Sequence, residues 1–389
     1  MLFLSSPACN PAREERKMSF YASISHGALV QERPCVSFIP PQKAYPPGIN
    51  SEPEEDGYTI QLEKHHFKAE EAGDHLVITA RIHGNEPSGE VAARRVIAEI
   101  QSGHIKLARG QLTIFPLLNP LAKQANVRGI WVDTNRDIHP NSHGPTPEHQ
   151  IRKAIVAEFK KLKNFFGFRN WHLLDLHSVP LAGKAHVIVS DQPQGGYSLT
   201  KKGFLVLACR ATKEKNFAQS LGTDTIYERW RHAWHAAEAP DVTALGHTQK
   251  SFRGFTSALI HAGLEFGAET SVCLESGQDD DPQSVEVAYN AIRNALQFHG
   301  LTDEPALPFP PTTQPEIIRF EKVLVRRDES EQLVGITHDA QRLEPGQVVL
   351  RGATREVTVP NEKADWLIAH PIPSANVGRH FGFLARKIA

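Results

Sequence analysis

Cysteine is scarce in this sequence, and the few cysteines lie far apart. The 389 residues include only Cys9, Cys35, Cys209 and Cys273, without the dense spacing of a secreted disulfide scaffold or the close pairs of a thiolate zinc site. The net charge is also close to zero, because the 43 Lys and Arg residues are balanced by 44 Asp and Glu residues. The protein therefore has no positive electrostatic field that would attract nucleic acid or an anionic membrane. No apolar run approaches the roughly 18–20 residues that span a bilayer. We therefore expect a cytoplasmic protein that binds neither nucleic acid nor a membrane.

Chain length and two proline-rich stretches predict the domain organisation. Residues 1–55 are rich in proline, serine and charge, and they predict an irregular N-terminal arm with an alternative start at Met18. Residues 302–315 are also proline-rich, which is typical of a linker. Because single cores rarely grow past about 250–300 residues, we expect a catalytic domain over residues 56–301. Apolar and polar residues alternate over residues 316–389, which predicts a small C-terminal β domain.

Strand and helix signals alternate along the larger domain. Short apolar runs of strand length are followed by segments whose apolar residues recur at helical spacing. The predicted strands cover residues 76–82, 112–118, 171–176, 186–190 and 271–274, and the predicted helices cover residues 90–100, 148–162, 225–239 and 284–298. This pattern predicts an α/β fold in which helices flank both faces of one sheet.

Two polar segments follow predicted strands, at the position where α/β folds place ligands. His83 and Glu86, in the tetrapeptide HGNE, are close enough in sequence to bind one ion, and His177 ends another apolar strand. Hydrolytic zinc sites often combine two imidazoles with one carboxylate and leave a fourth position for water. Asp175 shares a strand face with His177 and would orient its imidazole. If no metal binds here, His83 and Glu86 belong to an ordinary solvated loop, and Asp175 is a carboxylate that closes a strand.

Five motifs occur in an order that resembles one known family. HGNE follows a strand, NPLA is followed by an arginine, and DTNRD, DLH and a strand that ends in LES come later. From about residue 75 to residue 300, the chain resembles the succinylglutamate desuccinylase and aspartoacylase family of the zinc carboxypeptidase superfamily. The resemblance implies a zinc-carboxypeptidase-like mixed sheet with a C-terminal β domain. It also implies one Zn²⁺ per subunit, held by His83, Glu86 and His177.

The resemblance further implies roles for four residues outside the metal ligands. Arg128 matches the arginine that polarises the scissile carbonyl, Asn135 and Arg136 match the pair that clasps the substrate carboxylate, and Glu275 matches the catalytic glutamate. A hydrolytic zinc site needs such a base and such cations, and a guanidinium binds a carboxylate with two parallel hydrogen bonds. Taken alone, each arginine would be an ordinary surface residue and Glu275 a carboxylate at a strand end.

Two features depart from the family pattern. Thr134 stands where the family usually has leucine. The interval between His177 and Glu275 is also longer than the family leads us to expect, and it contains Trp230 and Trp234. The helical spacing of these tryptophans predicts a packing face, with a lid or specificity loop as the alternative.

Together, the residues and the resemblance predict a zinc-dependent amidohydrolase that cleaves an N-acyl amino acid with a free carboxylate. Two alternatives stay open. A zinc carboxypeptidase or peptidoglycan-peptide amidase would apply the same chemistry to peptides, and a non-catalytic binding protein would keep the fold without the reaction. The acyl group, the amino acid and the oligomeric state are not predicted.

Overall fold

The computed structural model describes most of the chain outside its N-terminal region. The described residues are 31–32, 60–140, 144–165, 170–190, 201–247, 258–305 and 314–388. The predicted irregular arm lies outside them, apart from strand β1 (Gln31–Glu32), and so do residues 306–313 of the predicted linker. Within the described ranges, no helix combines the length and the apolar character needed to cross a membrane.

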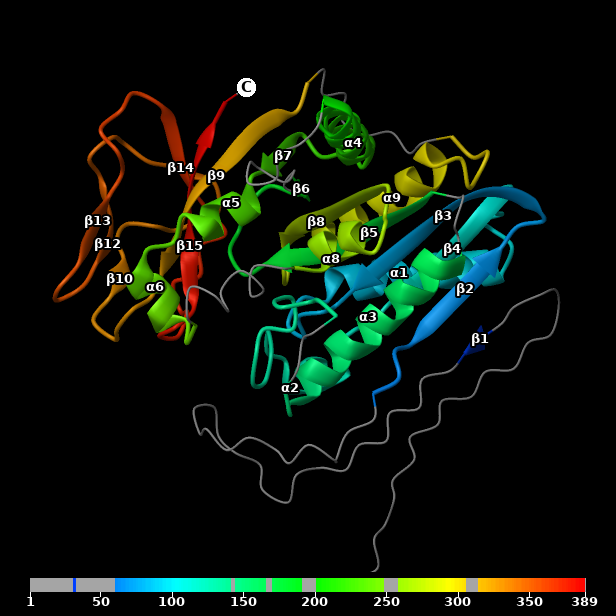
Figure 1. The fold of residues 1–389 in the computed structure, drawn as a ribbon, viewed down its shortest axis with the longest axis horizontal. Coiled ribbons are helices and arrows are strands. Elements are labelled where there is room, and N and C mark those ends of the chain that lie inside the picture. Colours follow the sequence, from blue (N-terminus) through cyan, green and yellow to red (C-terminus); the bar gives the residue numbers. More distant parts are fainter. Residues whose placement is uncertain are drawn as a thin grey trace, which may run out of the picture.

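One mixed sheet extends through the molecule (Figure 1). Its twelve strands lie in the order β1-β2-β4-β3-β5-β8-β6-β7-β9-β15-β14-β11. Their bounds are β2 Lys64–Lys68, β3 Glu71–Ala80, β4 Arg109–Phe115, β5 Trp171–Val179, β6 His186–Val189, β7 Thr225–Glu228, β8 Thr270–Gln278, β9 Glu316–Val325, β11 Gln341–Arg342, β14 Asp365–Ala369 and β15 His380–Lys387. Strands β4, β3, β5 and β8 run parallel to one another. Their carboxyl ends therefore meet at one edge, which is where open α/β sheets bind ligands.

Helices cover both faces of the parallel part of the sheet, as predicted (Figure 1). Along β3, Leu76 and Ile78 face one core while Val77 faces the other, because successive strand residues point to opposite sides. The helices on the first face are α1 Ser88–Gln101, α4 Lys201–Ser220 and α9 Pro282–Phe298, and those on the second are α3 Pro147–Phe165 and α8 Leu259–Glu265. In α9, Ala288, Ile292 and Ala295 are fully buried at helical spacing, which explains why this segment forms a packed helix.

The segment 225–239, which we predicted as one helix, is a strand followed by a short helix. Residues Thr225–Glu228 form β7, which pairs in parallel with both β6 and β9. Helix α5 (Trp230–His235) begins only after Arg229, whose φ of 69° is left-handed. The prediction was wrong because two strand edges were available to a β-branched and aromatic segment, and that pairing outweighs local helical spacing.

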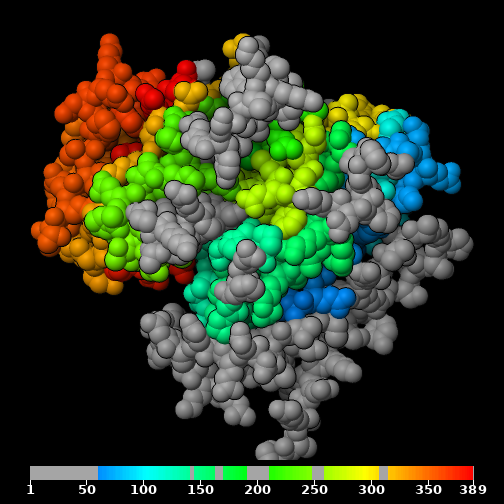
Figure 2. All heavy atoms as spheres, in the orientation of Figure 1, coloured from blue at the N-terminus to red at the C-terminus, as the bar shows by residue number. Residues whose placement is uncertain are grey.

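The C-terminal strands continue the central sheet. Strand β9 pairs in parallel with β7 and antiparallel with β15, so hydrogen bonds link the two parts of the chain. A second sheet contains β10 (Gln332–Leu333), β12 (Val348–Arg351) and β13 (Glu356–Thr358). The space-filling view shows the C-terminal region against the light-green segment with α5 and α6 (Ala239–Ala244), and both helices contact β9 (Figure 2). The predicted division into two domains stays a prediction.

Candidate metal centre and its cleft

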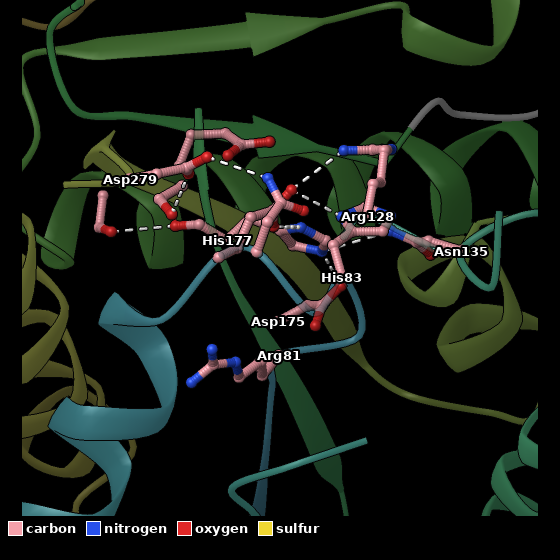
Figure 3. Close-up of polar contacts among 12 residues, drawn as sticks. Arg81, His83, Arg128, Asn135, Asp175, His177 and Asp279 are labelled. Atoms are coloured by element: carbon pink, nitrogen blue, oxygen red, sulfur yellow. Dashed lines mark hydrogen bonds and ion pairs between the residues drawn. The ribbon is translucent and has the colours of Figure 1, made fainter. Parts of the chain in front are cut away.

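Three buried side chains meet at the carboxyl ends of β3 and β5 (Figure 3). His83 and Glu86 lie in the turn between β3 and α1, and His177 lies in β5. His83 Nδ1 is 2.8 Å from Glu86 Oε1, and His177 Nδ1 is 2.7 Å from Glu86 Oε2. The two imidazole centroids are 4.8 Å apart. The three predicted ligands therefore lie within reach of one ion, since each offers a ligand atom within 4.8 Å of the others.

A glycine allows this turn to form against a neighbouring loop. A Cβ at Gly84 would lie 1.9 Å from the backbone carbonyl carbon of Ala122 in α2 (Pro120–Ala125). The Gly84 N–H donates to the carbonyl of Arg128, 3.4 Å away. The close approach holds the turn that carries His83 and Glu86 beside the loop that carries Arg128.

A carboxylate holds the far nitrogen of each imidazole. His83 Nε2 is 3.0 Å from Asp133 Oδ1, and His177 Nε2 is 2.8 Å from Asp175 Oδ2. The Thr79 hydroxyl donates to the other oxygen of Asp175 over 2.8 Å. Metal-bound histidines usually have such partners, which fix the ring orientation and tautomer. The sequence predicted this arrangement for Asp175 but not for Asp133, although Asp133 opens the DTNRD motif.

We expect Asp175→Asn to weaken zinc binding by about 10- to 100-fold. The substitution keeps the shape of the side chain but removes the charge that supports the His177 imidazole. Competition with a chromogenic chelator measures the dissociation constant. Asp137→Asn is the matched control, because Asp137 pairs with His139 at the edge of the same region and contacts neither ligand imidazole. Equal affinity in all three proteins would contradict ligation through His177.

The loop after α2 brings Arg128 and Asn135 to the metal centre. Arg128 Nη1 is 3.0 Å from Glu86 Oε1, and its Nε is 3.2 Å from Asp133 Oδ2. Asn135 places its side-chain nitrogen 3.3 Å from His177 Nε2 and accepts the Leu259 N–H over 2.7 Å. Both residues line the cleft. The structure thus brings two of the predicted substrate-contacting residues to the same edge as the ligands.

The departure at Thr134 has a structural role in this loop. The Asn119 side-chain amide donates to the Thr134 hydroxyl over 2.9 Å, while its oxygen caps α2 by accepting the Ala122 N–H. Asn119 begins the NPLA motif and Thr134 lies within DTNRD. The hydroxyl therefore ties the two motifs together, which leucine would not do.

Arg136 is a buried cation that shares its acidic partner, Asp133, with Arg128. Its guanidinium carbon lies 4.9 Å from the Trp230 ring centroid and 5.3 Å from that of Trp234. The Asp133 carboxylate, which also pairs with Arg128, is 3.8 Å away. Burial lowers the Arg136 pKa to about 10 against the attraction of Asp133, so the group stays charged at neutral pH. A cation in this state is suited to an anionic ligand.

Glu275 lies beside the metal centre on the neighbouring strand. Its Cα is the register partner of His177, its side chain lines the same cleft, and its Oε2 is buried without a hydrogen-bond partner. Burial raises the pKa of Glu275 well above its ordinary value; nearby Glu86 adds to the rise, whereas His177 and Arg128 oppose it. Such a carboxyl group can accept a proton and return it at neutral pH.

The rest of the cleft comes from segments that the sequence analysis did not assign to the site. His370 and His380, from the C-terminal region, contribute polar lining. An apolar wall completes the cleft; it is formed by Val179, Ile188, Trp230, Ala258, Ile260, Ile372 and Phe383. Trp230 and Trp234 are buried in a core with Phe383, as predicted for a packing face, and Trp230 also reaches the cleft.

The protein is an α/β protein with a candidate His/Glu metal site at the ends of its parallel strands. Comparison with known proteins identifies the family to which this fold and site are similar. Residues 72–226 match the profile of the succinylglutamate desuccinylase/aspartoacylase catalytic domain. The match identifies this stretch as a catalytic domain of that family. A search of curated proteins gives no significant match.

Solved structures share the fold across most of the chain. Succinylglutamate desuccinylase from Vibrio cholerae is 15% identical over 88% of this chain and 91% of its own, with a TM-score of 0.61. A product-bound ectoine utilization protein from Ruegeria pomeroyi is 15% identical over 86% and 92%, with a TM-score of 0.56. An aspartoacylase family protein from Mesorhizobium loti is 18% identical over 92% and 99%, with a TM-score of 0.54. At these identities, the likeness concerns the fold.

Proposed function

We propose that this protein is a zinc-dependent deacylase that hydrolyses the amide bond of an N-acyl amino acid. One observation carries the proposal. The cleft is lined by His83, His177 and the buried carboxyl of Glu275, and Glu86 contacts both histidines. The family consists of zinc-dependent hydrolases that act on N-acyl amino acids. Membership alone would not argue for activity, but the convergence of ligands and a proton-carrying carboxyl in this chain does.

The donor set suits zinc. Two imidazole nitrogens and one carboxylate oxygen are the ligands that catalytic Zn²⁺ sites combine, and both outer imidazole nitrogens already have carboxylate partners. One Zn²⁺ per subunit would be held by His83, Glu86 and His177. When bound in such a site, zinc lowers the pKa of a water ligand to about 7 and polarises a carbonyl.

The remaining residues would divide the other tasks of amide hydrolysis. Glu275 would take a proton from the attacking water and return it to the leaving amine, as a general base and then a general acid. Arg128, at the edge of the ligand group, would meet the negative charge that develops on the carbonyl oxygen. Asn135 and Arg136 would hold the substrate carboxylate and fix the register of the amide bond.

The lining of the cleft supports a substrate that is only partly polar. The Arg136 guanidinium lies over the Trp230 ring, and Trp230 belongs to the apolar wall with Ile260 and Phe383. A carboxylate bound at Arg136 would therefore place its neighbouring groups close to apolar side chains. We expect N-acetyl-leucine or N-acetyl-phenylalanine to show a higher kcat/KM than N-acetyl-aspartate or N-succinyl-glutamate.

A substrate panel tests the proposal directly. Zinc-loaded protein is assayed for amine release from N-acetyl and N-succinyl amino acids, from dipeptides and tripeptides, and from peptidoglycan stem peptides. Turnover of N-acyl amino acids supports a deacylase, whereas preference for peptides indicates the carboxypeptidase or amidase alternative. Absence of turnover, together with less than about half an equivalent of zinc, would support a non-catalytic binding protein.

We expect Arg136→Lys to lower kcat/KM by about 10- to 100-fold, chiefly through KM. Lysine keeps the charge but loses the two parallel hydrogen bonds that a guanidinium makes to a carboxylate, each charge-assisted bond being worth about 1.5–3 kcal/mol. Steady-state kinetics on an N-acyl amino acid and on its carboxamide analogue measure the effect. The wild-type preference for the carboxylate should shrink in the variant; an unchanged preference would show that the carboxylate binds elsewhere.

A further inference from the structure

Two imidazoles, those of His370 and His186, lie in series between Glu275 and a second cavity. His370 lines the cleft, and its Nδ1 is 3.7 Å from Glu275 Oε1. Its Nε2 is 2.8 Å from Nε2 of His186, which lines a separate cavity between β6, β7 and the C-terminal strands. Neither histidine belongs to the motifs that identify the family. The pair therefore needs its own explanation.

The hydrogen bonds of this pair fix where its hydrogens lie. His186 Nδ1 is 3.0 Å from the carbonyl oxygen of Lys184, and a carbonyl can only accept, so Nδ1 carries the hydrogen. Burial lowers the pKa of His186, and it lowers that of His370 to about 3, so both rings are neutral at pH 7. His186 Nε2 is then an acceptor and His370 Nε2 must donate to it. His370 Nδ1 consequently faces Glu275 with a lone pair and no hydrogen.

The backbone and the surrounding rings hold His370 in this position. Its φ of 50° is left-handed, a conformation that residues with a side chain rarely adopt. The backbone N–H of His370 donates to Oδ1 of the buried Asp339 over 2.7 Å. The rings of Tyr227 and Phe320 lie 5.9 and 5.7 Å from the imidazole centroid. The surroundings therefore oppose rotation of the imidazole.

Glu275 has no hydrogen bond among the described residues, and its Oε2 is buried without a partner. If His370 Nδ1 carried a hydrogen, a small movement would let it donate to Glu275 Oε1, which is 3.7 Å away. Hydrogen bonds in active sites are often this long before substrate binds. Hydrogen bonding to a carboxylate favours its charged form and so makes it a weaker base. The tautomer inferred for His370 avoids that outcome.

We propose that His186 and His370 are positioning residues that withhold a hydrogen-bond donor from the Glu275 carboxylate. His186 keeps His370 in the tautomer with hydrogen on Nε2, and Glu275 thereby stays free to accept a proton from the attacking water. The inference rests on the proposed role of Glu275 as the base. It adds that the strength of this base depends on a histidine that does not line the catalytic cleft.

Two substitutions at His186 separate this role from a packing role. His186→Gln keeps an acceptor for His370 Nε2, so kcat should stay within about twofold of wild type. His186→Leu removes the acceptor and lets His370 shift its hydrogen to Nδ1, so kcat should fall about tenfold, while KM and zinc content stay unchanged. Equal losses of kcat in the two variants, accompanied by equal losses of thermal stability, would overturn the proposal.

Tautomers can be read without any activity. Long-range ¹H–¹⁵N spectra of zinc-loaded, ¹⁵N-histidine-labelled protein distinguish the two neutral forms, and His186→Gln and His370→Asn identify the signals by their loss. We expect hydrogen on Nδ1 of His186 and on Nε2 of His370. Hydrogen on Nδ1 of His370 in the wild type would refute the proposal even if the protein is a deacylase. The expected tautomers in a protein that turns over no N-acyl amino acid would instead refute the assigned reaction, and with it the catalytic meaning of the pair.

Discussion

Glu275→Gln should lower kcat by roughly 10³-fold and leave one zinc bound per chain. Glutamine has nearly the same shape as glutamate but cannot accept a proton from water or return one to the leaving amine. Glu275 does not belong to the group of side chains that can bind the ion, so metal content should not change. Steady-state kinetics on the best substrate of the panel, together with metal analysis of the same preparation, measure both quantities.

A second carboxylate near the cleft provides the control for this experiment. Asp279 follows β8, and burial raises its pKa to about 6. Its oxygens accept hydrogen bonds from Ser178 and Asn85, and it does not line the cleft (Figure 3). Asp279→Asn should therefore keep kcat within a few-fold of wild type. An active Glu275→Gln beside an inactive Asp279→Asn would transfer the role of base to Asp279.

Burial of Glu275 also has a consequence for stability. Because its folded-state pKa is raised, ionising the group at neutral pH disfavours the folded state relative to the unfolded chain. This penalty is absent below the unfolded pKa of about 4.3 and grows as the pH rises above it. In zinc-free protein, Glu275→Gln should therefore raise the unfolding temperature at pH 7.5 but not at pH 4. A lower unfolding temperature at pH 7.5 would show that the carboxylate makes a stabilising contact.

Local sequence patterns were sufficient for the parallel part of the sheet. Most residues of the runs 76–82 and 171–176 are apolar, as expected of strands buried on both faces, and the two runs contribute to β3 and β5. Since parallel neighbours end at the same edge, a histidine at the end of each run predicted one shared site, and His83 and His177 do lie together. Here the signal is local and the geometry follows from the sheet.

The parts that the sequence did not predict depend on contacts between distant segments. Asp133 supports His83 across 50 positions, and His370 meets His186 across 184 positions. No periodicity or turn signal reports such pairings. The strand β7 was missed for the same reason, because its partners β6 and β9 come from opposite sides of it in sequence. Resemblance to a family supplied the roles of Arg128 and Arg136, whose surroundings are equally non-local.

Removing one ligand should remove the metal. We expect His177→Ala to retain less than about 0.2 equivalents of zinc after purification without chelator, because only His83 and Glu86 would remain of the three ligands. His75→Ala is a matched control: His75 is a buried histidine on the neighbouring strand β3, and its Nε2 lies 2.8 Å from the Thr113 hydroxyl rather than beside a ligand. That variant should lose some stability and keep its zinc.

Thermal unfolding provides a second readout of the same ligand. A metal that binds the folded chain stabilises it by about 2.7 kcal/mol when its free concentration is one hundred times the dissociation constant. A strong chelator should therefore lower the unfolding temperature of the wild type and of His75→Ala, but not that of His177→Ala, which has no metal to lose. If the chelator destabilises His177→Ala as much as the wild type, the stabilising ion is bound elsewhere, and the metal centre assigned to β3 and β5 is wrong.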